Sequence, residues 1–330
     1  MLVFLHDMGK LMFHDEVSLR RDVIVKPIQF FVVPATLVVC KHVPTENDPT
    51  LHQLPIHLEC MKKMRVQWQH FTTKGVLDHK LLLMLLCDHA PNVQTIINLM
   101  LKYGLLVKLQ HDPASSISDP PLLSYIVPPL LPDIKPSLTC QHSSSFYFVF
   151  TTSNYLEGNF TFITNSDLET HGFLPHGLFE RIIGKCVSWS QRTSKNNTLQ
   201  NCALGHSSAI LTFGSFRFQL KLMLELSSIE VKIEGNQPRA VMKRLCEIIN
   251  DIIKERMNML QYFTAVSFVR HGESSLIPLS SLNSAFERQS VMRNDNGDTI
   301  ITPDQVHSQY HQWLDLKVQH EEWHVFLSYR

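Results

Sequence analysis

The spacing of apolar residues changes along the chain, and this change constrains the fold more than any other feature. Between residues 75 and 104, apolar residues recur every three or four positions, as in an amphipathic helix. Between Phe216 and Leu226 they occupy every second position and alternate with polar residues such as Arg217 and Lys221. That alternation predicts a strand with one buried side and one solvent-facing side. The sequence therefore predicts an α+β protein, helical first and sheet-forming later.

The first half is predicted to be a winged-helix-like helical subdomain. One helix is expected around Leu77–Leu85, and a second between Asn92, as the N-cap, and Gly104, just past the C-terminus. Two short apolar runs, 105–109 and 122–127, then flank a polar loop and are expected to pair as a hairpin. Helices followed by a hairpin with a long tip are typical of winged helices. Upstream, Pro27 is expected to open a further helix.

The second half is predicted to be an antiparallel sheet covered by helices. Strands are expected at 146–150, 209–213, 216–226 and 229–233. Two amphipathic helices, from Pro175 to about Trp189 and from Pro238 to about Phe263, are expected to cover this sheet.

Loop-like composition predicts the domain boundaries. The winged-helix-like subdomain is expected to span 1–132, followed by a Pro/Ser-rich linker at 133–145. The sheet subdomain is expected to span 146–270. A second linker is predicted at 271–322, and the start of another domain at 323–330.

Charge, apolar run length and cysteine content disfavour a basic nucleic-acid binder, a membrane-spanning protein and a disulfide-linked protein. The 30 basic and 30 acidic residues give a formal net charge of zero, which disfavours a nucleic-acid binder that tracks phosphates with a basic face. No apolar run reaches 18 residues, so no membrane span is predicted. The seven cysteines are odd in number and contain no CxxC pair. They are interpreted as reduced thiols of a cytoplasmic protein, with no zinc site.

Two short motifs suggest chemistry but lack the residues that would complete it. His6-Asp7 resembles the metal-binding doublet of HD-type phosphohydrolases, without the upstream histidine of that metal shell. Arg270-His271-Gly272-Glu273 follows a predicted strand and resembles the phosphohistidine loop of histidine phosphatases. Too little sequence follows it to supply a second His and a second Arg. A phosphatase-like enzyme using this motif is therefore the alternative hypothesis rather than the leading one.

A winged-helix nucleic-acid binder is the other alternative. Its recognition helix would run from Asn92 to Gly104, where Lys102 is the only basic residue. Contacts to several phosphates need several basic side chains. We therefore expect no nucleic-acid partner. We also expect no catalytic residue, no cofactor and no metal in this chain.

Several segments, in this order, resemble the COR domain, which follows the Roc GTPase in Roco proteins. They are Leu5-His-Asp-Met-Gly9, Asp22-Val-Ile-Val-Lys-Pro-Ile-Gln-Phe30, Gly75-Val-Leu77, Tyr125-Ile-Val-Pro-Pro-Leu-Leu-Pro132 and Phe173-Leu-Pro-His-Gly-Leu-Phe-Glu-Arg-Ile-Ile183. In the second segment Ile28 separates Pro27 from Gln29, and Phe30 or Phe31 stands where the family has Trp. The last residues, Val325-Phe-Leu-Ser-Tyr-Arg330, resemble the first strand of a TIR domain.

The resemblance implies a non-catalytic scaffold that couples an upstream Roc GTPase domain to a downstream TIR-like signalling domain. GTP or GDP and Mg²⁺ are expected on the Roc domain and not on this chain. The first subdomain is expected to pack on that GTPase in cis, with candidate contacts at His6, Asp7, Lys10, Pro27 and Phe30. The second is expected to form a homodimer, with candidate contacts at Phe179, Arg181, Met223 and Lys254. TIR-domain proteins are further expected partners.

Overall fold

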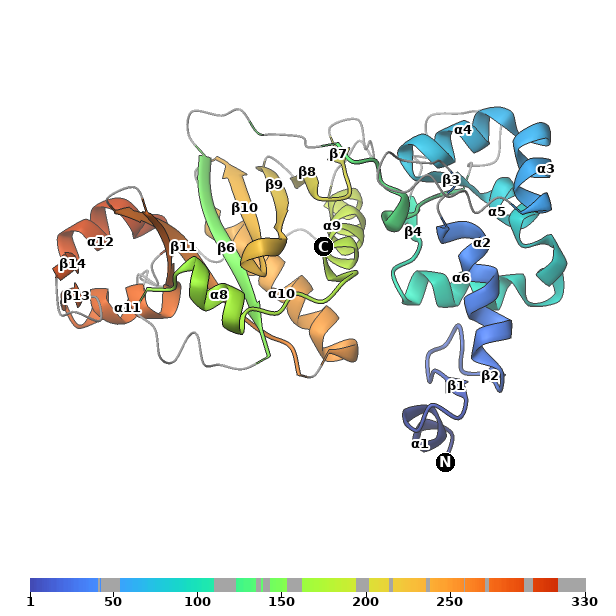
Figure 1. Ribbon diagram of the computed structural model, residues 1–330, viewed down its shortest axis with the longest axis horizontal. Coiled ribbons are helices and arrows are strands. Elements are labelled where there is room, and N and C mark those ends of the chain that lie inside the picture. The colour runs from blue at the N-terminus through green and yellow to red at the C-terminus, as the bar shows by residue number, and fades with distance from the viewer. Residues whose placement is uncertain are drawn as a thin grey trace. The chain divides into compact units, whose positions relative to one another are not determined.

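The computed structural model describes two compact units of mixed helices and strands (Figure 1). It covers residues 1–40, 42, 54–109, 123–134, 138, 143–152, 162–193, 202–213, 216–235, 238–257, 259–270, 273–293 and 299–313. Unit 1 comprises 1–137 and 176–215, and unit 2 comprises 138–175 and 216–330. The predicted α+β class is therefore confirmed.

Unit 1 begins with a small helix and a short two-stranded sheet. These elements are α1 (Leu2–Asp7), β1 (Met12–Phe13) and β2 (Val23–Ile24), with β1 and β2 antiparallel. The π-helical η1 (Ile28–Val32) then runs directly into α2 (Val33–Val39). In this wide turn the Val33 N–H bonds to the Ile28 carbonyl, five residues back rather than the usual four. Pro34, the next residue, has no N–H to give the carbonyl of Phe30.

The predicted winged-helix-like order of helices and hairpin is present. Its elements are α3 (Pro55–Lys63), α4 (Arg65–Lys74), β3 (Val76–Asp78), α5 (His79–Leu85), η2 (Cys87–Asn92), α6 (Val93–Lys102), β4 (Val107–Leu109), β5 (Ser124–Ile126) and η4 (Pro128–Leu130). The predicted pairing of β4 with β5 is confirmed, and β3 joins the other side of β5. Gly104 ends α6 with a φ of 72°, as predicted. Asn92 lies at the N-cap but its side chain makes no capping hydrogen bond.

The core of unit 1 is built from the inward faces of α2 to α6. Periodic apolar positions such as Leu81 and Leu85 on α5, and Ile96 and Met100 on α6, are buried together with Phe71 of α4. Asp78 fixes the start of α5, because its carboxylate accepts the N–H groups of Lys80 and Leu81. This core holds the helices that carry the surfaces described below.

Residues 176–215 belong to unit 1, which corrects the predicted 146–270 subdomain. They form α9 (Leu178–Thr193), β7 (Ala203–Leu204) and β8 (Ser208–Phe213). Within this unit α9 packs on β4, η4 and β8. The fit to β4 is close, since a Cβ added at Gly184 would lie 2.7 Å from Val107. The predicted packing of this helix on the strand at 209–213 is confirmed, because α9 contacts β8. Its contact with β4 is the part that sequence reasoning missed, because an apolar stripe does not encode every partner that covers it.

Unit 2 is built on antiparallel strands in the order β12-β11-β6-β10-β9. Their bounds are β6 (Ser143–Thr151), β9 (Phe216–Met223), β10 (Ser228–Glu234), β11 (Gln261–Arg270) and β12 (Glu273–Pro278). The remaining elements are α8 (Asn165–His171), η6 (Leu224–Leu226), α10 (Pro238–Arg256), α11 (Leu279–Glu287), β13 (Met292–Arg293), β14 (Thr299–Ile301), α12 (Pro303–Tyr310) and η7 (His311–Trp313).

Alternation on these strands divides the side chains between two faces. Phe146, Phe148 and Phe150 of β6 are fully buried on the face toward α10, whose apolar stripe is buried as predicted. On the other face Val149 packs with Leu168 of α8. Figure 1 shows α8 and α10 on opposite sides of β6 and β10. The predicted antiparallel sheet is therefore confirmed for the strands of unit 2.

Three predicted boundaries in unit 2 are corrected. α10 ends at Arg256 and not near Phe263, because β11 begins at Gln261 and pairs with the end of β6. The stretch 271–322, predicted as a linker, contains β12, α11, β13, β14, α12 and η7 in its described part. The linker predicted at 133–145 ends earlier than predicted, because β6 already starts at Ser143. Residues 323–330, predicted to start a further domain, lie outside the described residues.

Candidate interaction surface

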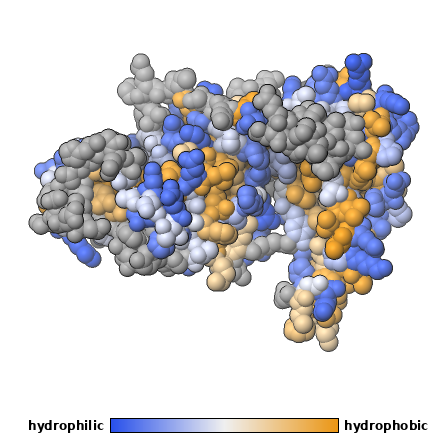
Figure 2. Space-filling model, in the orientation of Figure 1, coloured by the Kyte–Doolittle hydropathy of each residue, from blue (hydrophilic) through white to orange (hydrophobic). Residues whose placement is uncertain are grey.

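Exposed apolar side chains concentrate in the first 33 residues of unit 1. They belong to Met1, Leu2, Val3, Phe4, Met8, Val17, Val23, Val25, Ile28, Val32 and Val33. We call this set the N-terminal apolar surface. Figure 2 shows orange and pale orange atoms where Figure 1 places α1, β1 and β2. Large exposed apolar patches on a folded protein commonly mark sites of interaction.

The segment buries one side in its own core and leaves the other uncovered. Around β2, Ile24 points inward, whereas its neighbours Val23 and Val25 are exposed. On the next element Phe31 is buried, and Ile28, one turn earlier, is 69% exposed. Complete burial of one such aliphatic side chain contributes about 1.5–3 kcal/mol. A partner that covered several of them would therefore gain substantial binding energy.

The predicted GTPase-facing residues near the N-terminus lie on or beside this surface. The His6 ring is half-buried, with Nδ1 3.4 Å from the Leu11 carbonyl oxygen and its centroid 5.1 Å from that of His14. Asp7 lies in α1, but its side chain is outside the described part. Lys10 is exposed. Among these three, Lys10 is the side chain that the structure leaves open to solvent.

The two other predicted contacts, Pro27 and Phe30, are both half-buried. Pro27 occupies the N-cap of η1 rather than the predicted first helical position. Phe30 packs partly against the core of unit 1. Sequence reasoning missed Val25 and Ile28, which are more exposed than either. The sequence signal that could have found them is an apolar residue at a position where the periodicity of the strand or helix predicts a solvent-facing side chain.

The four predicted dimer contacts differ in how accessible the structure leaves them. Phe179 is only 2% exposed and belongs to the interior of unit 1, so it cannot contact a second copy. The Nε–H of Arg181 donates to the Tyr103 carbonyl at 3.3 Å within the same unit. Met223 is half-buried at the end of β9, and Lys254 is exposed on α10. Of the four, only Phe179 is removed by its burial, and Arg181, Met223 and Lys254 stay predictions.

The structure describes some of the residues on which the two alternative hypotheses depend. The backbones of Arg270 and Glu273 are paired in register at the ends of β11 and β12. His271, the predicted nucleophile of the phosphatase-like alternative, lies outside the described residues. Lys102, the base on which the nucleic-acid alternative depends, forms an ion pair with Glu16.

A buried cluster that sequence reasoning missed joins α2 to α3. Potential ligand atoms of Cys40, His42 and His57 lie within 4.8 Å of one another. Residues 41 and 43–53 lie outside the described part, so the cluster is described through these three side chains. The rings of Trp68 and Phe71, from α4, lie 5.1 and 4.9 Å from the His42 ring. The residue types are those of a transition-metal site.

Hydrogen bonding places a proton on Nε2 of both histidines, and on His57 it also leaves Nδ1 without one. The Nε2 atom of His42 lies 3.2 Å from the Val38 carbonyl oxygen and must donate to it. His57 donates from Nε2 to the Leu37 carbonyl at 2.9 Å, and its Nδ1 accepts the Leu54 N–H at 3.1 Å. A metal ligand needs a nitrogen lone pair, and His57 keeps none for a metal in this arrangement. The cluster therefore fits a structural role better than a metal site.

These bonds link the ends of two helices. Leu37 and Val38 belong to the last turn of α2, whose carbonyls have no partner inside the helix, and Leu54 is the N-cap of α3. Burial lowers the pKa of His42 to about 4, because the charged imidazolium would lose its hydration. Burial also raises the pKa of the Cys40 thiol. Both groups are therefore uncharged at neutral pH.

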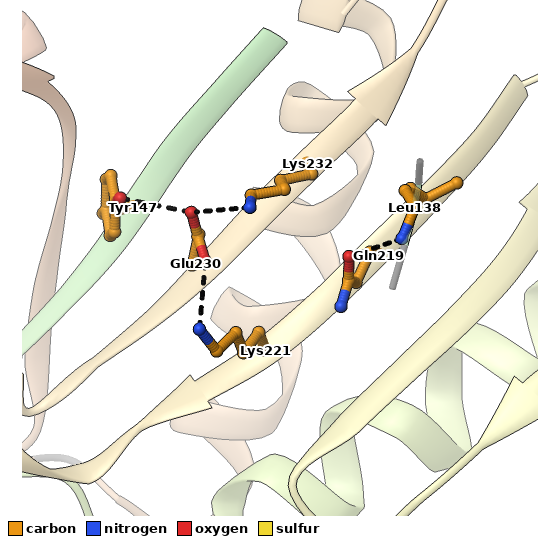
Figure 3. Close-up of polar contacts among 6 residues, drawn as sticks. All are labelled: Leu138, Tyr147, Gln219, Lys221, Glu230 and Lys232. Atoms are coloured by element: carbon orange, nitrogen blue, oxygen red, sulfur yellow. Dashed lines mark hydrogen bonds and ion pairs between the residues drawn. The ribbon is translucent and has the colours of Figure 1, made fainter. Parts of the chain in front are cut away.

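A second polar group, on unit 2, surrounds Glu230 of β10 (Figure 3). Glu230 is 8% exposed. Its carboxylate accepts a hydrogen bond from the Tyr147 hydroxyl at 3.2 Å and lies 3.6 Å from the Lys232 Nζ and 3.9 Å from the Lys221 Nζ. Burial, followed by the nearby carboxylate, raises the pKa of Tyr147. Nearby Gln219, predicted to face solvent, is buried, and its Oε1 accepts the Leu138 N–H at 3.1 Å.

We expect Glu230→Gln to lower the free energy of unfolding by about 1 kcal/mol. The amide can still accept the Tyr147 hydroxyl, but it no longer neutralises Lys221 and Lys232. Partly exposed ion pairs contribute little and are screened by salt. Urea denaturation at low and high salt measures the effect, which should shrink at high salt. A loss that does not depend on salt would contradict this assignment.

Unit 2 also contains an open cleft of about 410 Å³. Its lining includes Arg239 and Cys246 of α10, Tyr262 of β11, Asn283 of α11 and Trp313. The volume falls within the range of small-ligand sites. Burial raises the pKa of both Cys246 and Tyr262, so neither is an activated nucleophile or base. The Tyr262 hydroxyl lies 3.2 Å from the Cys246 carbonyl oxygen and 3.0 Å from the Asn250 Oδ1.

Comparison with protein-family models and with curated proteins finds no match for this chain. In the part of the chain that the structure describes, no helix combines the length and the apolar character needed to cross a bilayer. No disulfide joins the six described cysteines. The resemblance to the COR domain is therefore carried by the sequence segments alone.

Proposed function

We propose that this chain is a non-catalytic scaffold and dimerisation module of the COR type, acting in the cytoplasm. It couples an upstream Roc GTPase domain to a downstream TIR-like signalling domain. GTP or GDP and Mg²⁺ are held by the Roc domain, and this chain passes the nucleotide state onward through its contacts. No nucleic acid is involved.

The observation that carries the proposal is the position of the N-terminal apolar surface. The resemblance places the GTPase contacts around residues 6–10 and at the helix that starts after Pro27. The exposed apolar side chains of unit 1 concentrate in the same region, on α1, β2 and η1. Agreement between a sequence resemblance and an uncovered apolar surface supports a docking role for this segment.

Binding to a Roc-type GTPase domain from the same protein tests the proposal. Isothermal titration calorimetry should give saturable binding with a negative heat-capacity change, because apolar surface is buried. Affinity should differ between the GDP-loaded and GTP-analogue-loaded forms of the GTPase. Absence of binding to both forms would contradict the proposal.

The dimerisation part of the proposal has its own test. Met223 and Lys254 lie on unit 2, which also exposes Phe173, Leu224 and Met259. We expect sedimentation velocity of the chain to show an increasing sedimentation coefficient as concentration rises. Met259→Asp should shift this curve toward monomer, whereas Val66→Asp, on α4 of unit 1, should leave it unchanged. A constant monomer coefficient across the concentration range would contradict dimerisation.

A further inference from the structure

We propose that the Cys40–His42–His57 cluster is an acid-sensitive clamp that fixes the end of the docking helix. This inference rests on the proposed function only for the identity of what docks. The clamp itself is a property of unit 1 and can be measured without a partner.

The carbonyls that the clamp holds and the docking residues lie on one continuous helical segment. Ile28, Val32 and Val33 are exposed in η1 and at the start of α2. The carbonyls held by the two imidazoles, those of Leu37 and Val38, belong to the last turn of α2. Whatever releases this turn from α3 therefore frees the far end of the helix that presents Ile28.

Protonation disfavours the clamp for a stereochemical reason at His57 and because of the surroundings at His42. The Nδ1 atom of His57 accepts the Leu54 N–H, so a proton added there would place two donors against each other. The Nδ1 atom of His42 lies 3.8 Å from the Cys40 Sγ, in a site lined by Trp68 and Phe71. An imidazolium there has no carboxylate to stabilise it among the described groups that act on it. Its titratable neighbours are Cys40 and His57.

The surrounding helices supply few charges that could reverse this effect. On α3, Glu59 is exposed and pairs with Lys63, and Cys60 is buried with a raised pKa. On α4, the basic residues Arg65, His70 and Lys74 are all exposed. On α2 the buried side chains are Pro34, Ala35 and Val38. The described environment therefore favours the neutral clamp.

The direction of the pH dependence follows from the lowered pKa of His42. The folded form resists protonation down to about pH 4, whereas the released imidazole takes up a proton near its ordinary value of 6.5. The clamp is fully stable above pH 6.5 and weakens as pH falls toward 4. For this pair of values the opening equilibrium should rise roughly 50-fold between pH 7 and pH 4.5.

Amide hydrogen exchange by NMR, corrected for intrinsic rates, tests the clamp in the chain alone. The reporters are the amides of Cys40 and His57, which bond to Thr36 and Leu54 at the two clamped helix ends. Between pH 7 and pH 4.5 they should lose roughly 50-fold protection, while the amides of α6 keep theirs. Equal loss in α6 would indicate global unfolding and would overturn the proposal.

The paired variant His42→Gln with His57→Gln provides a clamp that cannot titrate. Glutamine offers both a donor and an acceptor, as the neutral ring does. We expect this variant to lose less than threefold protection over the same range. His70→Gln, at an exposed position on α4, should behave as wild type. Wild-type behaviour in the double variant would overturn the proposal.

A measurement on the wild-type protein covers the case in which the double variant does not fold. Ring nitrogen NMR should show both histidines as Nε2–H tautomers at pH 7, with His42 still neutral at pH 5.5. Uptake of a proton by His42 above pH 6 would contradict the clamp.

Acid weakening of GTPase binding that disappears in the double variant would link the clamp to docking. Without GTPase binding at any pH, the docking function fails while the exchange result still decides the clamp.

Discussion

Ile28→Asp is expected to weaken binding to the Roc-type GTPase domain at least 30-fold. Ile28 is 69% exposed on η1, at the centre of the segment where sequence resemblance and exposed apolar surface coincide. A central aliphatic contact contributes about 2 kcal/mol or more to an interface, and each 1.4 kcal/mol corresponds to a factor of ten. The new carboxylate would also have to lose its hydration against an apolar partner.

Val66→Asp is the matched control for that experiment. Val66 lies on α4 of the same unit and is 66% exposed, so the substitution replaces a similar aliphatic side chain with the same carboxylate at nearly the same exposure. It should alter the dissociation constant less than twofold. Because both sites are exposed, neither variant should change the melting temperature by more than a few degrees. Equal effects of the two variants on binding would contradict the docking assignment.

Gly172→Ala is expected to lower the free energy of unfolding by about 3 kcal/mol. A Cβ at this position would lie 2.4 Å from the Leu168 carbonyl oxygen and 2.6 Å from the Ser227 Cβ. The backbone cannot move away freely, because the Gly172 N–H bonds to that carbonyl at 2.8 Å and the next residue bonds to Phe150 of β6. Urea denaturation followed by circular dichroism measures the loss.

Ser227→Gly tests whether the contact with Ser227 causes part of that loss. Ser227 has a φ of 43°, so glycine there should by itself stabilise the fold by about 1 kcal/mol. In the double variant it should also recover part of the Gly172→Ala loss, while the clash with Leu168 remains. Strict additivity of the two substitutions would show that the predicted contact between them does not exist.

Local patterns predicted most of the elements. Alternation from Phe216 gave the buried Phe218 and Leu220 of β9, and period-three-to-four spacing gave α6 with Gly104 just beyond it. Patterns of this kind report the period and the buried side of a segment. They failed where a tertiary partner decides the outcome. Leu224 continues the alternation, yet β9 ends at Met223 and Leu224 is exposed in η6.

The assembly of the units depended on contacts that one sequence does not display. The apolar stripe of α9 fits any flat apolar surface, and the contact between Gly184 and Val107 that places it on β4 joins residues 77 positions apart. The stretch 271–322 was assigned as a linker because its turn residues obscured a short strand and short helices. Short elements bury too few residues to leave a clear period.

The candidate sites were predictable only in part. The region of the N-terminal apolar surface was indicated by the resemblance, but the exposure of Val25 and Ile28 depends on which side of each element meets the core. The clamp joins Cys40 and His42 to His57 across a gap in sequence, with no spacing that signals it. Likewise Glu230 follows the expected outward alternation, and its near burial arises from side chains on neighbouring strands.

Hydrogen–deuterium exchange of this chain, with and without the Roc-type GTPase domain, tests the central claim most directly. Docking should slow exchange in peptides from the first 33 residues, with the largest change around η1, and should leave α4 near Val66 unchanged. Unaltered exchange in the N-terminal segment at saturating GTPase would contradict the account.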